Sequence, residues 1–257
     1  MRRKGLPVDG VLLLDKPYAV TSNAALQTAR KLLNAQKAGH TGTLDPLASG
    51  LLAITFGEAT KFSADLLLAD KTYEAKIGLG RTTTTGDLEG EFISESEVSA
   101  TEADIEAVLE QFRGDIMQTP PMFSALKRDG KTLYDLARDG VSIDLEPRQV
   151  HIAELVMLSY EECTLTVRVT CSKGTYIRVL AEDIGKALGC GAYLKALRRT
   201  AVGPLSLSEA VELQALRDMA PEERLAQLKP LDALMQTLEA VYLTEEQCTR
   251  FCHGQRL

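Results

Sequence analysis

The chain lacks several features that would assign it to common protein classes. It contains no run of about eighteen apolar residues, which argues against a transmembrane helix. Its basic first residues are not followed by the apolar stretch and small-residue cleavage site of a signal peptide. Its five cysteines are an odd number scattered over 257 residues, which argues against a disulfide framework. We therefore expect a cytoplasmic protein without a membrane partner.

Residues needed for a zinc site, for a phosphatase and for a phosphate-binding loop are also missing. The stretch CTRFCH, from Cys248 to His253, has no second pair of ligands at zinc spacing, so we expect no metal site. The stretch DGVLLLDK resembles the first motif of haloacid-dehalogenase-like phosphatases. That family's nucleophile would stand at Pro7, which can neither attack a phosphate nor bind Mg²⁺. GLGRTTTTGD and CSKGT do not fit the phosphate loop of nucleotide-binding proteins either.

Positive charge is absent from one long segment. Between residues 87 and 110 the chain carries nine of its 36 acidic residues and no Lys or Arg. The rest of the chain therefore has 27 acidic residues against 29 basic ones, although the whole chain has a net charge of −7. This distribution is compatible with a locally basic face, which a nucleic-acid partner would require.

Hydrophobic periodicity predicts strands and helices in mixed order. Apolar or alternating runs predict strands over 10–16, 51–57, 71–80, 150–158, 163–171 and 193–203, with 150–158 and 163–171 as a hairpin. Helical spacing and caps predict helices over 21–35, 58–69, 101–114 and 174–189. Thr101 and Asp104 have the spacing of a capping box, and Gly114 is expected to close that helix. Because strands and helices do not alternate strictly, we expect an α+β fold with a mixed or antiparallel sheet.

One loop between two apolar segments is unusually rich in turn-forming residues. The stretch GHTGTLDPLASG, residues 39–50, surrounds Asp45 with three glycines, His40 and Pro46. The glycines allow the backbone to approach a ligand closely. Pro46 restricts Asp45 to extended conformations and so limits where its carboxylate can point. A tight Asp-Pro turn is the simpler interpretation, but a plain turn requires fewer of these residues.

The same loop carries a family resemblance. GHTGTLDPLASGLLAITFGEATK, residues 39–61, closely resembles the catalytic motif of the tRNA pseudouridine-55 synthase (TruB) family. Further blocks of that family follow in the same order over roughly residues 9–215. These blocks are DKPYAVTS at 15–22, DKTYEAKIGLG at 70–80, FRGDIMQTPPMFSALKRDGKTLYDLARDG at 112–140 and CSKGTYIRVLAEDIGKALGCGAYLKALRRTAVG at 171–203. The resemblance implies a pseudouridine-synthase fold with a mixed, largely antiparallel sheet flanked by helices.

The resemblance also implies a reaction and a set of site residues. The enzyme would extrude a uridine from the T-arm loop of tRNA, detach its base, rotate it and rejoin it through carbon. Asp45 would be the catalytic carboxylate, acting on the sugar, on the base or on a ribose proton, and Arg178 its cationic partner. Tyr73 would stack on the extracted base, with a further part in proton transfer left open. His40 would help to displace or replace the flipped base, and Tyr176 and Leu197 would form further walls of the uracil pocket.

Phosphate contacts would come from basic residues spread along the motifs. The candidates are Lys61, Lys127, Arg128, Lys131, Arg138, Lys173, Lys195, Arg198 and Arg199. The reaction is an isomerisation without redox or energy input, so we expect no cofactor. We expect a monomer whose macromolecular partner is tRNA, recognised by the shape of its T-arm.

The sequence departs from the family pattern at a few positions. Ala19 replaces a usual glycine, Thr84 a usual aspartate and Phe123 a common tyrosine, whereas Asp87 is retained. We expect a catalytic domain over 1–210, a helical connecting segment over 211–242 and the start of an incomplete PUA-like RNA-binding domain over 243–257. The alternative function is a non-catalytic tRNA-binding protein or RNA-folding chaperone. Binding alone does not require Asp45, Tyr73 and Arg178 together.

Overall fold

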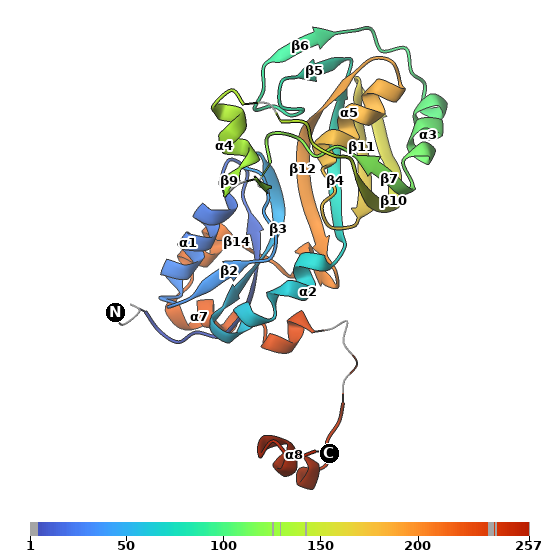
Figure 1. Ribbon diagram of the computed structural model, residues 1–257. Coiled ribbons are helices and arrows are strands. Elements are labelled where there is room, and N and C mark those ends of the chain that lie inside the picture. Colours follow the sequence, from blue (N-terminus) through green and yellow to red (C-terminus); the bar gives the residue numbers. More distant parts are fainter. Residues whose placement is uncertain are drawn as a thin grey trace.

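The computed structural model of the chain describes residues 5–124, 126–128, 130–141, 143–235, 239 and 241–256 (Figure 1). The strands are β1 (Gly10–Lys16), β2 (Ala38–His40), β3 (Ala48–Phe56), β4 (Lys71–Leu79), β5 (Arg81–Thr83), β6 (Phe92–Glu95), β7 (Gly114–Gln118), β8 (Lys127–Arg128), β9 (Lys131–Thr132), β10 (Arg148–Glu161), β11 (Thr164–Cys171), β12 (Ala192–Val202), β13 (Leu205–Ser206) and β14 (Val211–Glu212). The helices are α1 (Ser22–Leu32), α2 (Ser63–Leu68), α3 (Glu102–Gln111), α4 (Leu133–Arg138), α5 (Ile177–Ala187), α6 (Leu213–Asp218), α7 (Pro221–Ala226) and α8 (Glu245–Cys252), with 3₁₀ helices η1 (Gly57–Lys61), η2 (Leu207–Glu209) and η3 (Leu231–Leu234).

A ten-stranded mixed sheet forms the centre of the molecule. Its strand order is β14-β1-β3-β12-β4-β11-β10-β7, and β2 and β13 pair with β3 and β12. The pairs β1–β14 and β3–β12 are parallel, and the other neighbouring pairs are antiparallel. This confirms the expected α+β fold with a mixed, largely antiparallel sheet flanked by helices.

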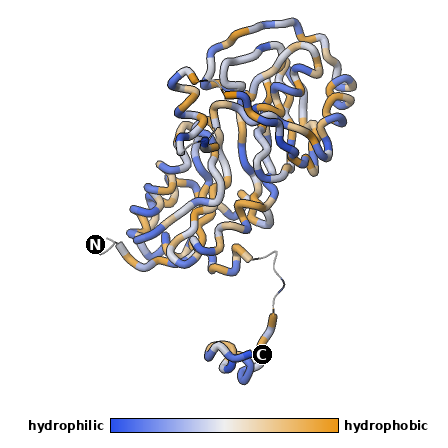
Figure 2. Tube along the Cα trace, in the orientation of Figure 1, coloured by the Kyte–Doolittle hydropathy of each residue, from blue (hydrophilic) through white to orange (hydrophobic). Residues whose placement is uncertain are grey.

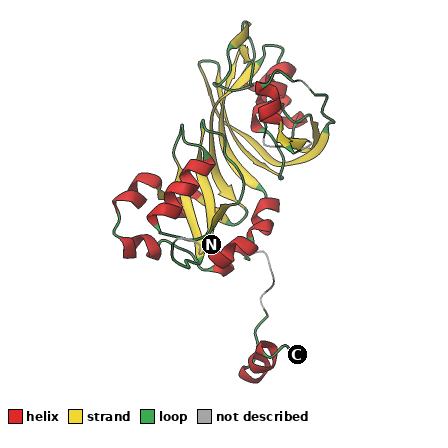
Figure 3. Ribbon diagram, turned by 60° about the vertical axis from the view of Figure 1, so that its left-hand side comes forward, coloured by secondary structure: helices red, strands yellow, loops and turns green. Residues whose placement is uncertain are grey.

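The sheet divides into two lobes on either side of β12. We call β1, β2, β3 and β14 with α1, α2 and α6 the first lobe, and β4, β7, β10 and β11 with α3 and α5 the second lobe. Separate groups of helices accompany the two parts of the sheet in Figure 3. In the first lobe apolar clusters cover both faces of β1 and β3. In the second lobe one cluster lies between the strands and the helices α3 and α5.

The burial of individual strands follows from this arrangement. β3 is buried at eight of its nine positions, and its sequence is a nearly continuous apolar run, as expected for a strand covered on both faces. β11 alternates between buried and half-buried residues, as expected for a strand with one solvated face. Figure 2 shows apolar segments interspersed with hydrophilic ones along the trace of the sheet.

β3 and β12 join the two lobes at a close approach of their backbones. Arg199 of β12 is in register with Gly50 of β3. Gly50 has φ +101°, and a Cβ at this position would lie 2.3 Å from the carbonyl oxygen of Arg199. Only glycine fits here, because any side chain would collide with main-chain atoms. The parallel pairing of β3 with β12 therefore depends on a glycine of the Asp45 motif.

Several predicted element boundaries are confirmed. Thr21 caps α1 by accepting a hydrogen bond from the Ala24 amide, and Thr101 and Asp104 form the expected capping box of α3. The hairpin of β10 and β11 is also present. α8, which begins after a capping box at Thr244, lies apart from the sheet in Figure 1.

Other predicted boundaries are wrong for local reasons. The helix expected over 58–69 is split into η1 and α2, because Phe62 leaves the helical conformation. Gly114 does not close α3, which ends at Gln111; it begins β7 with φ +81°. The strand expected from Cys163 begins one residue later, because Glu162 and Cys163 form the hairpin turn with φ +47° and +58°. The helix expected from residue 174 begins only at Ile177, because Tyr176 is extended.

Candidate active site

The loop between β2 and β3 holds Asp45 in a fixed backbone. The Ser22 hydroxyl donates a hydrogen bond to the Leu44 carbonyl and accepts one from the Leu44 amide, both at 2.8 Å. Lys16 is fully buried, and its Nζ donates to the carbonyls of Pro17, Val20 and Pro46. The residues on both sides of Asp45 are thus held in place, whereas the Asp45 side chain itself is 46% exposed.

Arg199 also holds this loop in place, through hydrogen bonds to its backbone. Its side chain is 1% exposed, and its Nε donates to the Leu51 carbonyl at 2.7 Å and its Nη2 to the Gly42 carbonyl at 3.2 Å. Buried guanidinium groups need such partners because their desolvation is costly. Arg199 was expected to contact RNA phosphates. The structure places its side chain inside the protein, with Nε and Nη2 donating to backbone carbonyls, which favours a part in holding the loop.

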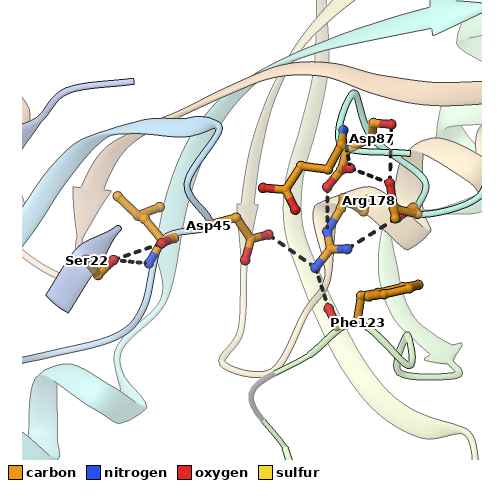
Figure 4. A network of polar contacts seen from close by, with 8 residues as sticks. Ser22, Asp45, Asp87, Phe123 and Arg178 are labelled. Atoms are coloured by element: carbon orange, nitrogen blue, oxygen red, sulfur yellow. Dashed lines mark hydrogen bonds and ion pairs between the residues drawn. The ribbon is translucent and has the colours of Figure 1, made fainter. Parts of the chain in front are cut away.

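Arg178 lies in the first turn of α5 and joins three loops (Figure 4). Its Nη2 lies 3.2 Å from Asp45 Oδ2 and donates to the Phe123 carbonyl at 2.8 Å. Its Nη1 donates to the Thr85 carbonyl at 3.2 Å. The side chain is only 8% exposed. The structure therefore brings Arg178 and Asp45 together, and the guanidinium is oriented by groups other than Asp45.

Asp87 is a second carboxylate on the same guanidinium. Its Oδ2 lies 3.4 Å from Arg178 Nε, and its side chain is 10% exposed. Its Oδ1 accepts hydrogen bonds from the Thr85 hydroxyl at 2.6 Å and the Glu89 amide at 3.0 Å. Asp87 was expected only as a residue that the family retains, with no place in the site. It is one of nine acidic residues in a segment without Lys or Arg, and such a segment resembles a solvated surface.

A cavity of about 270 Å³ contains five of the predicted site residues: Asp45, Tyr73, Tyr176, Arg178 and Leu197. These residues come from both lobes and from β12 between them. The start of α5 is fixed here by Gln118, which accepts from the Tyr176 amide at 3.0 Å and donates to the Tyr176 carbonyl at 3.3 Å. The lining combines two aromatic rings and several aliphatic side chains with the Asp45–Arg178 pair and the cations Lys71, Lys173 and Arg199. Rings and aliphatic groups suit a flat base, and the cations suit the phosphates of its nucleotide.

Burial changes the acid–base properties of two residues near this cavity. Desolvation raises the pKa of Tyr73, so its phenol keeps its proton at neutral pH. Desolvation, together with the positive charge of Arg199, lowers the pKa of His40, so its imidazole is neutral at pH 7. Neither side chain therefore adds charge to the site at neutral pH.

His40 lines a second cavity, of about 420 Å³, which the Asp45–Arg178 pair also lines. It does not line the first cavity. Its Nδ1 is buried and, among the described residues, has no hydrogen-bond partner. Five residues line both cavities, and we call them the neck: Thr43, Leu44, Asp45, Ser124 and Arg178.

The basic residues expected to bind phosphates are dispersed. Lys173 lines the first cavity. Arg198 pairs with Asp15 at 2.6 Å and donates to the Ser49 hydroxyl at 3.2 Å, beside a separate cavity. Lys61 is exposed, pairs with Glu58 and lines neither cavity of the site. The side chains of Lys127 and Arg138 lie outside the described part of the chain.

Two features are absent from the described ranges. No cluster of three or more His, Cys, Asp or Glu side chains with the geometry of a metal site occurs among these residues. No helix in this part of the structure is long and apolar enough to cross a membrane.

Comparisons with known proteins agree with the geometry of the site. The family model "TruB family pseudouridylate synthase (N terminal domain)" matches residues 30–177, and "tRNA pseudouridylate synthase B C-terminal domain" matches residues 178–242. A protein named tRNA pseudouridine synthase B from Burkholderia mallei (strain NCTC 10247) is 59% identical over 100% of this chain and 84% of its own length. One with the same name from Azoarcus sp. (strain BH72) is 57% identical over 97% of this chain and 83% of its own length.

Solved structures show the same fold. A chain in the crystal structure of a Cbf5-Nop10-Gar1 complex superimposes with a TM-score of 0.74 and 31% identity, over 95% of this chain and 67% of that chain. A chain in the archaeal box H/ACA sRNP Nop10-Cbf5 complex gives a TM-score of 0.72 and 27% identity, over 100% and 74%. With a family model that spans more than half of its residues and relatives this similar, the chain belongs to the TruB family of pseudouridylate synthases.

Proposed function

We propose that this enzyme isomerises uridine 55, in the T-arm loop of tRNA, to pseudouridine, with Asp45 as the catalytic carboxylate. One observation carries the proposal. The half-exposed carboxylate of Asp45 lies 3.2 Å from a buried guanidinium, at a cavity lined by Tyr73, Tyr176 and Leu197. The names of the relatives, tRNA pseudouridine synthase B, support tRNA as the substrate.

The reaction requires a fixed carboxylate beside an extruded nucleotide. The bond between C1′ of the ribose and N1 of uracil breaks, the base turns, and C1′ bonds to C5. The proton on C5 is lost and N1 gains one, so atoms and electrons balance without a redox partner. Asp45 acts on the sugar, on the base or on a ribose proton, and each role needs the orientation that Arg178 and the held Leu44 backbone give it.

The other site residues receive roles that fit their environment. The neutral Tyr73 contributes its ring to stacking on uracil; a phenolate base is disfavoured because burial raises its pKa. The uncharged His40, in the second cavity, takes the place of the extruded base in the RNA stack. Lys173, which lines the first cavity, and Arg198, which lies beside a separate cavity, are candidates for phosphate contacts.

Since every residue of the neck belongs to one chain, we propose the monomer as the active form. tRNA as the substrate supports the cytoplasm as the place of action. The monomer is checked by light scattering at the concentration used for activity measurements, where a mass near 28.0 kDa is expected.

The test is tritium release from a T-arm RNA labelled at C5 of uracil, without added metal. Asp45→Asn should reduce release by at least about 10³-fold, because it removes the charged group but not the shape. Asp115→Asn is the matched control, since this aspartate on β7 is 62% exposed and lines neither cavity. Absence of release from the unsubstituted protein, with RNA binding preserved, would instead favour a non-catalytic RNA-binding protein.

A further inference from the structure

The neck between the two cavities is where the sugar of an extruded nucleotide would lie. In the proposed reaction the extruded base occupies the first cavity, which Tyr73 and Leu197 line, and His40, which takes its place in the RNA stack, lines the second. A nucleotide that reaches from one cavity into the other therefore carries its ribose past the five residues common to both. Asp45 is one of these, as a carboxylate that acts on the nucleotide should be.

One neck residue has an unsatisfied polar group. Ser124 is 6% exposed, and its hydroxyl has no hydrogen-bond partner within the described residues. A buried hydroxyl without a partner destabilises the unbound protein, and such groups are uncommon in native structures. The other polar neck side chains differ, because Asp45 pairs with Arg178 and Thr43 is exposed to solvent.

The backbone of Ser124 is fixed, so its hydroxyl has a defined place. The Ser124 amide donates to the Met122 carbonyl at 2.9 Å, and its carbonyl accepts from the Tyr134 amide at 3.0 Å. The preceding carbonyl, of Phe123, binds the same Nη2 of Arg178 that contacts Asp45. Ser124 therefore directly follows the residue whose carbonyl orients Arg178 toward Asp45.

We propose that the Ser124 hydroxyl hydrogen-bonds the 2′-hydroxyl of the extruded uridine, so that the neck recognises ribose. This inference rests on the proposed function. A 2′-hydroxyl both donates and accepts, and it is the group by which proteins distinguish RNA from DNA. On binding, the 2′-hydroxyl of the nucleotide gives the Ser124 hydroxyl the hydrogen-bond partner that it lacks in the unbound protein.

The experiment is a binding cycle in the full chain carrying Asp45→Asn, which prevents turnover. Dissociation constants are measured for two T-arm RNAs that differ only in uridine or 2′-deoxyuridine at the target position. The deoxy substitution should weaken binding by about fivefold, equivalent to roughly 1 kcal/mol. Ser124→Ala should weaken binding of the uridine RNA by a similar factor and leave the deoxyuridine RNA unchanged. Its melting temperature should not fall, because the orphaned hydroxyl is removed.

Thr41→Val is the matched control. The Thr41 hydroxyl is also buried and without a partner in the described part of the chain, but Thr41 lines neither cavity. It should retain the preference for ribose. The inference is overturned if Ser124→Ala keeps that preference, or if it weakens both RNAs equally. Failure of the proposed function is separately visible, as absent tritium release from the protein with Asp45 and Ser124 intact.

Discussion

The first lobe encloses β1 and β3 between two apolar layers, whereas the second lobe leaves one face of β11 to solvent. The two halves of the charged pair come from these different surroundings. Asp45 extends from a loop whose backbone is held by two buried groups, Lys16 of the first lobe and Arg199 of β12. Arg178 comes from a helix of the second lobe and is itself buried. The comparison suggests that the first lobe fixes the position of the reacting group and the second lobe fixes its counter-charge.

Removing the counter-charge should produce the largest change. Arg178→Met leaves Asp87 nearly buried without its cation, which should lower the free energy of unfolding by roughly 3 kcal/mol. Tritium release should fall by about 10²–10³-fold, because Asp45 loses its orienting partner. Arg178→Lys retains the charge but not the planar guanidinium. Its unfolding free energy and its rate of tritium release should lie between those of Arg178→Met and the unsubstituted protein.

A second variant, Asp87→Asn, separates the effects of the two carboxylates that contact Arg178. It retains a hydrogen-bond acceptor for the Thr85 hydroxyl and the Glu89 amide, so it tests the charge of Asp87 alone. If Arg178→Met has normal stability, Asp87 does not depend on Arg178 for compensation.

Much of this contrast between the lobes could be predicted from the sequence, because it follows local patterns. The continuous apolar run of β3 and the alternation of β11 identify the strands and their exposure. The meeting of Asp87 with Arg178 could not be predicted, since it depends on the long-range bridge that places Asp87 beside Leu194 of β12. Burial of Arg199 has the same cause: its register opposite Gly50 places it inside the sheet, and no local pattern distinguishes it from Arg198.

A smaller effect should come from loosening one lobe at a time. Ser22 in the first lobe and Gln118 in the second each hold a single residue by both its amide and its carbonyl. Ser22→Ala should reduce the rate constant of tritium release by about tenfold and the unfolding free energy by about 1–2 kcal/mol, because Leu44 precedes Asp45. Gln118→Met should affect stability similarly but activity less, because three further contacts orient Arg178. If Gln118→Met loses more activity than Ser22→Ala, the second lobe and not the first controls the position of the reacting carboxylate.

The buried lysine of the first lobe should make stability depend on pH in a defined direction. Burial lowers the pKa of Lys16 from 10.5 to about 8. Below pH 8 the lysine is protonated in both states, and between pH 8 and 10.5 the unfolded chain binds more protons, so the unfolding free energy rises with pH. The free energy of unfolding of the unsubstituted protein minus that of Lys16→Met should be constant up to pH 8. It should then increase by at most about 1.4 kcal/mol per pH unit.

Guanidinium titrations at pH 7, 8, 9 and 10 measure this difference, in which the other titrating groups cancel. Lys76→Met, at an exposed lysine on β4 of the second lobe, is the matched control. A constant difference across the whole range would show that burial in the first lobe does not alter the protonation of Lys16.

The smallest expected effect concerns the loop that surrounds Lys16. Ala19 has φ +60°, a left-handed conformation in which its Cβ is strained, and the loop adopts it while the carbonyls of Pro17 and Val20 bind Lys16 Nζ. Ala19→Gly should relieve this strain and raise the unfolding free energy by about 0.5–1 kcal/mol, after the greater flexibility of glycine in the unfolded chain is subtracted. Cys163→Gly, in the β10–β11 turn of the second lobe with φ +58°, should give a similar gain. Denaturant titration measures the unfolding free energies of the two variants. If only Cys163→Gly gains stability, the packing of the first lobe, and not the strain in the Ala19 backbone, sets the stability of the loop around Ala19.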